Sequence, residues 1–499
     1  MTATDSAPTV RDAVASHRFA MRIGGEAVAL GRRQLVSVDP TTERQLAEFP
    51  EATPADVDHA VQAAGAAASE WGRQPWTSRA AALHELATAI DGNAEELALL
   101  DTLDGGMPIR TARKDVADSA RALRYFAGLG GGIEGRSLPW SGEGPQLRTM
   151  REPYGIVGKI VPFNHPLKFA VVKVAAPLIA GNSVILKPSE FTSLSALRLG
   201  ELAAGCLPAG VLNVLAGRGE VGAAMVAHPG IPRLAFTGSV ATGQAVLRAA
   251  AENIKHVTVE LGGKNPMIVF GDVDPRTAAQ AAVANMDLRR TPGQACWSTS
   301  RVFVHASIRK PFLDALVEAV AEVRVGDPTD PDVDMGPLAY EGHHRRVTEL
   351  VAAGRAEGAT LLCGGDRPAH LPTGYFLQPT VFTDVEHGMR IATQEIFGPV
   401  ISVLTWRDTE EVLRQANDTT YGLTASVWSA DAAQADEAAR RLEAGMVWVN
   451  SAATRPLGMP FGGYKRSGLG KEGSFEDVVS YTREKSIIST ALPAVQRHD

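Results

Sequence analysis

Short apolar runs rich in β-branched residues alternate with helical patterns between residues 155 and 270. The runs are GIVGKIV (155–161), NSVILKP (182–188), VLNVL (211–215), RLAFTG (233–238), HVTVEL (256–261) and PMIVF (266–270). Between them, segments such as 193–205 and 243–254 carry apolar residues at helical spacing. This alternation is typical of βαβ units. It predicts a parallel sheet covered by helices, with any ligand at the carboxyl ends of the strands.

A second series of the same kind predicts a second α/β domain that begins near residue 262. Its apolar runs are SRVFVH (300–305), PVISVLTW (399–406) and ASVWSA (425–430), with helical patterns over 308–323 and 343–359. Before both series, residues 55–105 have a helical pattern broken at Asp91-Gly92-Asn93 and are predicted as a helical lead-in. The Gly- and Pro-rich segment 128–146 is predicted to be a loop or an extended excursion from the main body.

Composition favours a multidomain protein that acts on small molecules. A chain of 499 residues with 45% apolar residues can bury several cores and suggests two to four domains. The net charge is −7, and its 56 acidic and 49 basic residues are spread along the chain without a basic stripe. We therefore expect neither a nucleic-acid nor a membrane partner.

No segment of the sequence has the pattern of a membrane span or a signal peptide. The longest apolar stretch, FAVVKVAAPLIAG (169–181), is interrupted by Lys173 and Pro177 and falls short of the roughly 20 residues that a span needs. The first residues lack an apolar core of the kind found in signal peptides. The expected location is the cytoplasm.

The cysteines and histidines indicate neither a disulfide framework nor a metal site. Cys206, Cys296 and Cys363 are far apart and form no CxxC pair. The 12 histidines show no HExxH or similar ligand spacing. Each cysteine therefore has to be considered as a free thiol.

Cys296 lies in the sequence TPGQACWSTS (291–300), which favours a reactive role. A lone cysteine is most often a small buried hydrophobe. Here Pro292 and Gly293 predict a turn directly before it, and Gly293 allows the backbone to approach a ligand closely. A nucleophile beside a free amide N–H suits acyl transfer.

Seven short motifs together resemble the NAD(P)-dependent aldehyde dehydrogenase superfamily. They are PFNHP (162–166), KPSE (187–190), FTGS (236–239), VELGGKNP (259–266), GQAC (293–296), QEIFGPV (394–400) and PFGGYKRSG (460–468). The resemblance covers about residues 35–485, with the motifs in the family's order.

The resemblance implies three catalytic residues. Cys296 would add to the aldehyde carbon, Glu260 would activate the water that hydrolyses the thioester, and Asn164 would donate its side-chain N–H to the oxyanion beside the Cys296 backbone N–H. Without the resemblance, Glu260 reads as a solvated residue at a strand end. Asn164 likewise reads as a cap of the helix that begins near Pro166.

The phosphate-binding residues implied by the resemblance follow a strand but do not form a GxGxxG motif. The segment GSVATG runs from Gly238 to Gly243, and Ser239 lies at the start of the following helix, where an anion is stabilised. Gly219 is implied to lie beside the same pyrophosphate. By itself this signal could come from any turn between a strand and a helix.

Four further residues are implied to contact the nucleosides of the cofactor. Lys187 and Glu190 would bind the adenine ribose, and Glu190 would repel a 2′-phosphate, so NAD is expected more than NADP. Glu395 would bind the nicotinamide ribose, and the Phe397 ring would pack beside the nicotinamide. Otherwise Glu395 is a surface residue and Phe397 a core residue.

The predicted fold class is α/β, with a Rossmann-like dinucleotide-binding domain, a second α/β catalytic domain and a small β oligomerisation arm. The predicted domains are 1–130 with 152–261 for NAD binding, 262–465 for catalysis, and 131–151 with 476–499 for the arm. The arm resembles the family's oligomerisation strands, and an exposed strand edge needs a partner. A homodimer or homotetramer is therefore expected.

Several residues around the implied aldehyde tunnel depart from the family's usual pattern, namely His165, Arg289, Arg290, Trp297 and Arg455. One hypothesis is that an arginine, above all Arg455, pairs with a carboxylate or another polar group of the aldehyde. Alternatively, Arg455 points to solvent or to a partner subunit.

The leading interpretation is an NAD-dependent enzyme that oxidises an aldehyde to a carboxylic acid through a cysteine thiohemiacetal. A coenzyme A-acylating semialdehyde dehydrogenase is the enzymatic alternative, although such members of the superfamily tend to lack the glutamate found here at Glu260. A catalytically silent structural relative is the third.

Overall fold

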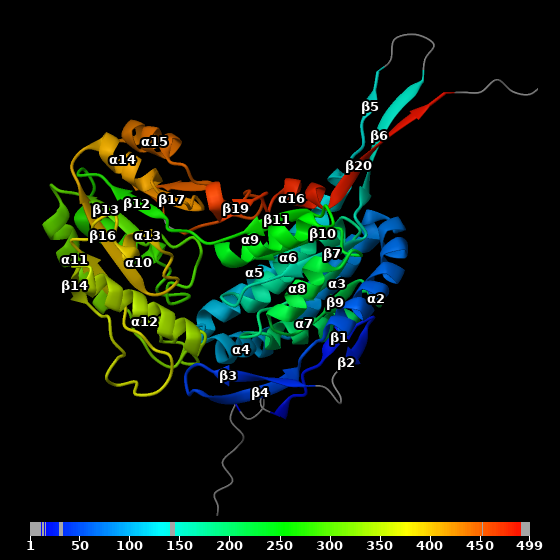
Figure 1. The fold of residues 1–499 in the computed structure, drawn as a ribbon, viewed down its shortest axis with the longest axis horizontal. Coiled ribbons are helices and arrows are strands. Elements are labelled where there is room, and N and C mark those ends of the chain that lie inside the picture. Colours follow the sequence, from blue (N-terminus) through cyan, green and yellow to red (C-terminus); the bar gives the residue numbers. More distant parts are fainter. Residues whose placement is uncertain are drawn as a thin grey trace, which may run out of the picture.

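The computed structural model describes residues 16–28, 33–139, 145–451 and 453–490, together with Arg11 and Val14. Parts of the predicted arm, residues 140–144 and 491–499, lie outside the described residues. The structure is of the predicted α/β class, with two parallel-stranded sheets covered by helices and a three-stranded arm that projects from one end (Figure 1).

The first sheet has the strand order β19-β11-β10-β7-β8-β9-β1-β2. Its five central strands are parallel: β7 (Ile156–Ile160), β8 (Ser183–Lys187), β9 (Leu212–Val214), β10 (Arg233–Thr237) and β11 (His256–Glu260). The edge strands β1 (Met21–Ile23), β2 (Glu26–Val28) and β19 (Gly468–Leu469) are antiparallel. In chain order the central strands run 3-2-1-4-5, so the order reverses between β7 and β10.

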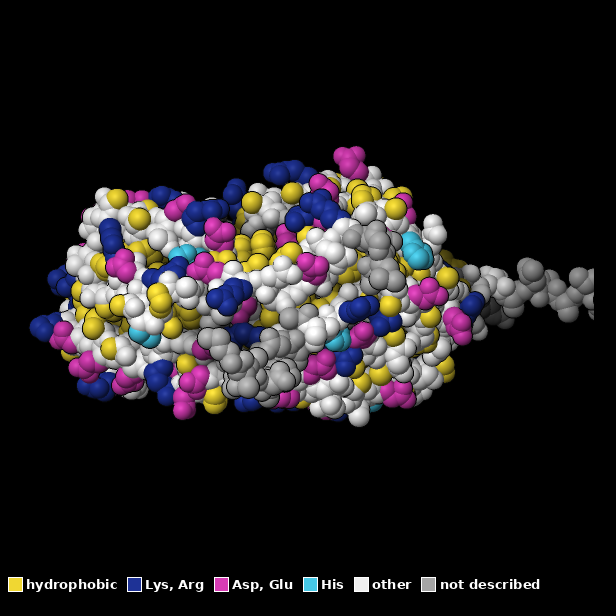
Figure 2. All heavy atoms as spheres, turned by 90° about the horizontal axis from the view of Figure 1, so that it is seen from below, with side chains coloured by type: hydrophobic (Ala, Val, Ile, Leu, Met, Phe, Trp, Pro, Cys, Tyr) yellow, Lys and Arg dark blue, Asp and Glu magenta, His cyan; other side chains and the backbone are white. Residues whose placement is uncertain are grey.

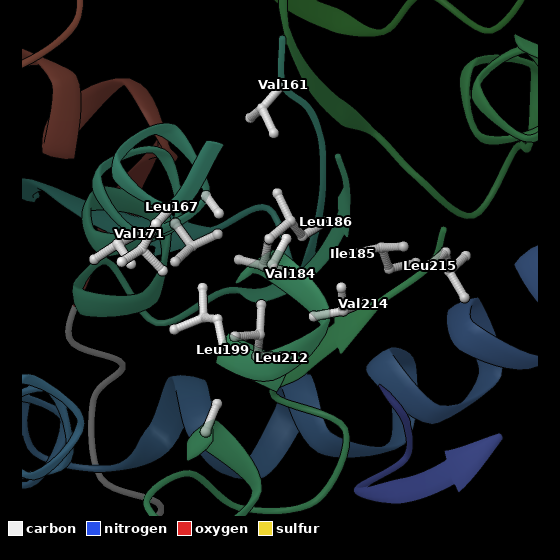
Figure 3. Close-up of a cluster of buried hydrophobic side chains, with 14 of the residues drawn as sticks. Val161, Leu167, Val171, Val184, Ile185, Leu186, Leu199, Leu212, Val214 and Leu215 are labelled. Atoms are coloured by element: carbon white, nitrogen blue, oxygen red, sulfur yellow. The ribbon is translucent and has the colours of Figure 1, made fainter. Parts of the chain in front are cut away.

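Helices connect and cover these strands because their apolar stripes face the sheet. The crossover helices are α6 (Pro166–Ile179), α7 (Leu194–Ala204), α8 (Gly219–Ala227) and α9 (Val240–Ala251). Figure 3 shows β8 and β9 side chains packing against Leu167 and Val171 of α6 and Leu199 of α7, all of them almost fully buried. This burial fixes where each strand ends and where its following helix begins.

The predicted helical lead-in consists of three helices, and a fourth follows it. They are α2 (Pro54–Arg73), α3 (Trp76–Gly92), α4 (Ala94–Gly105) and α5 (Ile109–Leu129). The expected break at residues 91–93 is confirmed, since α3 ends at Gly92, and a further break occurs at Gln74-Pro75. Strands β3 (Gln34–Asp39) and β4 (Arg44–Pro50) form a separate antiparallel pair.

The second sheet has the order β14-β15-β16-β13-β12-β17-β18, and all of its pairs are parallel except β14 with β15. Its strands are β12 (Pro266–Val269), β13 (Arg301–His305), β14 (Thr360–Cys363), β15 (Thr380–Thr383), β16 (Val400–Trp406), β17 (Thr424–Trp428) and β18 (Met446–Val449). Its helices are α10 (Pro275–Asn285), α11 (Arg309–Ala321), α12 (Glu341–Ala356), α13 (Arg390–Thr393), α14 (Thr409–Asn417) and α15 (Ala432–Arg441). Separate apolar clusters fill its two sides.

The arm consists of β5 (Ser137–Leu138), β6 (Gln146–Pro153) and β20 (Thr482–Ser489), paired in the order β20-β6-β5. The segment predicted as a loop or extended excursion is thus partly β-strand. A short helix, α16 (Phe475–Ser480), leads from β19 into β20.

None of the described helices is long and apolar enough to cross a membrane. On the face shown in Figure 2, Lys and Arg side chains are interspersed with Asp and Glu side chains. That face therefore shows no large patch of one charge.

Candidate active site

The loop between α10 and β13 carries Cys296 and is held from three sides. Asn265, directly before β12, donates from Nδ2 to the Cys296 carbonyl at 2.8 Å. Asn164, directly before α6, donates to the Gln294 carbonyl at 2.8 Å. Thr424 of β17 donates its hydroxyl to the Trp297 carbonyl at 3.0 Å. Both sheets therefore fix the backbone on either side of the sulfur.

Gly293 is required where the chain turns into this loop. Its φ of +69° lies in the left-handed region, and an added Cβ would come within 2.4 Å of the Gly398 carbonyl oxygen. A side chain at this position would displace either the Cys296 loop or the segment around Phe397. The close approach expected from the Pro292-Gly293 turn is thus an approach to the protein's own backbone.

A cavity of about 680 Å³ opens at the carboxyl ends of the first sheet's strands and extends to Cys296. It lies where the strand order reverses, which is where open α/β sheets bind their ligands. Ten of the predicted site residues line it: Asn164, Lys187, Glu190, Gly219, Gly238, Ser239, Glu260, Cys296, Glu395 and Phe397. Residues that end or follow the five central strands thus meet residues from loops and helix α12 of the second α/β part.

Gly243 is the predicted site residue that does not line the cavity. It lies within the first turns of α9, and an added Cβ would meet the Leu261 side chain at 2.5 Å. Its lack of a side chain allows α9 to pack closely on the chain after β11.

Glu260 ends β11 and is almost fully buried. Neither carboxylate oxygen has a hydrogen-bond partner among the described residues. Burial raises the pKa of Glu260 to about 8, while the nearby charges of Lys173, Arg455 and Lys471 act to lower it. A buried carboxyl group without partners beside a nucleophile has the properties of a general base.

Burial likewise raises the pKa of the Cys296 thiol, to about 12. The carboxylates of Glu395 and Glu260 act in the same direction, whereas the cations Lys173 and Arg455 favour the thiolate. Without a ligand in the cavity, the sulfur is therefore protonated at neutral pH.

Two N–H donors are available beside the sulfur. The Asn164 side chain uses one amide N–H for the Gln294 carbonyl and keeps a second. Within the described part of the chain, the Cys296 backbone N–H has no acceptor. This pair can stabilise an oxyanion formed on a carbonyl carbon that bonds to the sulfur.

Two helices begin at the cavity wall with features that suit an anionic ligand. Ser239 is the N-cap of α9, since its hydroxyl accepts from the Thr242 N–H at 3.2 Å, and Gly219 begins α8. The partial positive charge of a helix N-terminus stabilises phosphate groups. Lys187 donates to the Pro188 carbonyl at 3.0 Å, and its nitrogen lies 3.8 Å from a Glu190 carboxylate oxygen.

Glu395 lies on the opposite wall and is held against the chain after β11. Its carboxylate accepts from the Gly263 N–H at 3.0 Å, and an added Cβ on Gly262 would overlap it. Burial raises the pKa of Glu395 to about 7. The two glycines of VELGG therefore leave the space that Glu395 occupies.

The sequence did not predict the aromatic part of the wall. Phe163, Tyr340, His343 and Arg346 also line the cavity, and the Phe163 ring lies 5.3 Å from that of Tyr340 and 5.6 Å from that of Phe397. His343 and His344 are adjacent in the sequence, but nothing in their spacing connects them with Phe163, which follows β7 of the first sheet.

A buried ion-pair network behind Glu260 was also not predicted. Lys173 of α6 pairs with Glu472, and the Lys159 nitrogen lies 3.8 Å from the same carboxylate. Burial lowers the pKa of Lys173 to about 8. The sole sequence signal was Lys173 interrupting the apolar stretch 169–181.

The residues expected around the aldehyde tunnel have different environments. His165 is buried and bonded to Asp115, and Arg289 lies 3.4 Å from Glu322 at the exposed surface. Arg455 is half-buried, with its guanidinium carbon 4.7 Å from the Phe461 ring centre. Solvent is therefore not its main environment, and His165 and Arg289 are already paired.

An α/β oxidoreductase has this sheet order, with a cavity where the strand order reverses and a cysteine beside that cavity. The model of the aldehyde dehydrogenase family matches residues 29–487. The chain belongs to this family, and it is an enzyme that oxidises aldehydes.

Solved structures of similar proteins agree over almost the whole chain. An aldehyde dehydrogenase from Bacillus cereus, solved as an NAD⁺ complex, is 40% identical, with 96% of this chain and 98% of that chain covered and a TM-score of 0.91. An NAD-dependent aldehyde dehydrogenase from Sinorhizobium meliloti is 36% identical, with 99% of both chains covered and a TM-score of 0.93. A betaine aldehyde dehydrogenase from Staphylococcus aureus, solved with NAD⁺, is 33% identical, with 96% of both covered and a TM-score of 0.93.

Proposed function

We propose that the protein oxidises an aldehyde to a carboxylic acid with NAD, using Cys296 as nucleophile, Glu260 as general base and Asn164 as oxyanion donor. The observation that carries the proposal is that all three line one cavity with the carboxyl ends of the first sheet. Acyl chemistry needs a nucleophile, a base and N–H donors around one carbonyl carbon.

In the first step the Cys296 thiol gives up its proton to solvent, and the sulfur adds to the aldehyde carbon. The charges of Lys173 and Arg455 favour the thiolate, and the Asn164 amide and the Cys296 N–H receive the oxygen of the thiohemiacetal. NAD bound in the cavity would supply the hydride acceptor, and a thioester would then remain on Cys296. Removal of one oxyanion donor typically lowers the rate about 10²- to 10³-fold.

Glu260 then takes a proton from the water that attacks the thioester. Its unpaired, buried oxygens suit this role, because a raised pKa makes the carboxylate a stronger base. Hydrolysis releases the acid and restores the thiol. Lys173, paired with Glu472, supplies the positive charge that limits the rise of the Glu260 pKa.

The cavity fits NAD through groups of this chain. The starts of α8 and α9, with Gly219, Gly238 and Ser239, would hold the pyrophosphate. Lys187 and Glu190 would hold the adenine ribose, and Glu395 and Phe397 the nicotinamide riboside. The relatives solved with NAD⁺ support this assignment. The Glu190 carboxylate would repel a 2′-phosphate, so kcat/KM should be higher with NAD than with NADP.

The proposed domains are 1–130 with 152–261 for cofactor binding, 262–465 for catalysis, and 131–151 with 476–499 for oligomerisation. The arm supports a homodimer or homotetramer, because Leu138, Met150 and Ile488 expose apolar side chains on it. A cytoplasmic location is also proposed, since the three cysteines are free thiols.

The proposal is tested by following NADH formation with a panel of aliphatic, aromatic and carboxylated aldehydes. Parallel reactions contain coenzyme A, and their products are separated and identified. Acid formation with no acyl-coenzyme A is expected. Acyl-coenzyme A as the main product would show the acylating enzyme instead, and no NADH with any aldehyde would contradict the proposal.

A further inference from the structure

Several cations lie around the Cys296 loop, and three of them have a carboxylate partner. Lys173 pairs with Glu472. Lys168 lies 2.8 Å from Asp115 and 3.3 Å from Asp118. Arg290 lies 3.3 Å from Asp287. Their charges are already compensated by the protein itself.

Arg455 has no described carboxylate within 4.0 Å of its guanidinium, as is also true of the charged groups of Lys264 and Lys471. Its Nη2 donates to the Glu472 backbone carbonyl at 3.3 Å, and its guanidinium lies over the Phe461 ring. The charges of Glu260 and Asp477 act on this half-buried cation from beyond hydrogen-bond distance, so no carboxylate pairs with it directly. The Arg455 guanidinium has five N–H donors in a planar fork, and among the described residues they have a single acceptor.

The segment that carries Arg455 is held in place by the protein. Trp448 of β18 donates from its ring nitrogen to the Thr454 carbonyl at 2.8 Å, and Gly458 N–H donates to the Gly473 carbonyl at 3.2 Å. The Phe461 ring supports the flat face of the guanidinium. Arg455 is therefore positioned before any ligand arrives.

Arg455 is also close to the reactive sulfur without lining the cofactor cavity. Phe461, Trp297 and Cys296 belong to one packed cluster, and the Trp297 and Phe461 rings are 6.4 Å apart. The charge of Arg455 acts on Cys296 and on Glu260. Arg455 does not line the cavity that would hold NAD, so a role for its donors concerns the other reactant.

We infer that the aldehyde substrate carries a carboxylate, which Arg455 binds while Cys296 attacks the carbonyl carbon. The inference rests on the proposed aldehyde oxidation and names its substrate class. A carboxylate matches the planar guanidinium with two parallel hydrogen bonds and would be its directly paired counter-charge. A cationic aldehyde would instead meet a positive charge that has no direct carboxylate partner.

The test compares kcat/KM for succinic semialdehyde and for butyraldehyde, which have four carbons each and differ in the carboxylate. A trimethylammonium aldehyde and a phosphorylated aldehyde are the further probes. The wild-type protein should prefer the carboxylated aldehyde over the neutral one and reject the cationic one. The phosphorylated aldehyde should be poorer than the carboxylated one, and the opposite order would overturn the carboxylate assignment.

In Arg455→Leu, the ratio of kcat/KM for the carboxylated over the neutral aldehyde should fall about 10- to 100-fold, because a hydrogen bond to a charged group is lost. Arg455→Lys keeps the charge but loses the fork, and its ratio should be intermediate. Arg290→Leu is the matched control, because Arg290 packs on Trp297 but already pairs with Asp287. Its ratio should equal that of the wild type.

A ratio unchanged in both Arg455 variants, or reduced equally in Arg290→Leu, would overturn the inference. If Arg455→Leu is inactive with every aldehyde, Arg455→Lys still tests the inference. Its ratio of kcat/KM for the carboxylated over the neutral aldehyde does not depend on a general loss of rate. Failure of the proposed function has a different result, namely no NADH from the wild type with any probe.

Discussion

The Cys296 sulfur lies among buried carboxylates, so its protonation controls the chemistry. Because burial and the carboxylates of Glu395 and Glu260 raise the pKa of the thiol to about 12, the thiolate is scarce in the cofactor-free protein below that pH. Lys173 and Arg455 oppose this shift but do not cancel it.

A prediction for this residue is a steep pH dependence of alkylation. In the cofactor-free protein, the rate of Cys296 alkylation by iodoacetamide should rise about tenfold per pH unit up to about pH 10, without a plateau. The rate is measured by quantifying the modified Cys296 peptide by mass spectrometry. A plateau near pH 7 would contradict the protonated thiol.

Replacement of Glu260 should separate the two half-reactions. Glu260→Gln should still give a burst of about one NADH per site, while steady turnover falls roughly 10²-fold or more because thioester hydrolysis loses its base. Stopped-flow absorbance measures both phases. Loss of the burst together with turnover would instead place Glu260 in the first step.

The raised pKa of Glu260 also predicts the direction in which kcat changes with pH. Because the pKa of Glu260 is raised to about 8, its basic form declines as the pH falls below about 8, and kcat of the wild type should decline with it. In Glu260→Gln, the residual steady-state rate should not show this decline below about pH 8. The same decline in both proteins would show that another group titrates.

At the scale of elements, the site depends on how α4 holds the helices that follow β7 and β8. Asp101 accepts from the Leu167 N–H in the first turn of α6 at 3.1 Å, and Asp104 accepts from the Leu194 N–H at the start of α7 at 3.0 Å. Both carboxyl groups are buried, and the Ser37 hydroxyl also donates to Asp104 at 2.5 Å. Two residues one turn apart thus cap two helices.

Asp104→Ala should destabilise the protein by about 1–3 kcal/mol, because two buried donors lose their acceptor. The midpoint of urea unfolding, followed by fluorescence, should fall accordingly. Asp91→Ala on α3 is the control, since Asp91 is an exposed partner of Arg124 and should shift the midpoint little. Equal shifts in the two variants would contradict the capping role.

The sequence predicted the strands and crossover helices of the first sheet well, because each buried parallel strand is a short continuous apolar run. It did not predict β3 and β4 or the break at Pro75. Their patterns are short or half-exposed, as in β3, where exposed and buried residues alternate. The order of the strands was also not predicted, since periodicity carries no information on which strands pair.

In the site, the residues that belong to sequence motifs could be predicted from the sequence. The residues that contact and support them could not. Cys296, Glu260 and Asn164 lie in recognisable motifs, whereas Lys173 and its partner Glu472 are separated by 299 residues. Nothing local to either residue predicts that pair. The fold alone brings them together behind Glu260.

At the scale of the whole molecule, the arm carries strand edges away from the two sheets (Figure 1). β20 is an edge strand of the arm, and Ile488 on it is 71% exposed. Such an edge favours pairing with a second copy of the chain.

Ile488→Lys should therefore weaken the oligomer. Light scattering after size-exclusion chromatography should show a lower mass than for the wild type at the same concentration. Ile254→Lys is the matched control, because Ile254 is 91% exposed after α9 and lies on no strand of the arm, so the mass should be unchanged. An unchanged mass in Ile488→Lys would contradict a role of this edge in assembly.

The most direct test of the account is a peptide mass map of Glu260→Gln after reaction with NAD and an aldehyde, quenched in acid. We expect the Cys296 peptide to carry the mass of the acyl group, in an amount that matches the NADH formed, with Cys206 and Cys363 unmodified. NADH formation with an unmodified Cys296 peptide would contradict the covalent mechanism.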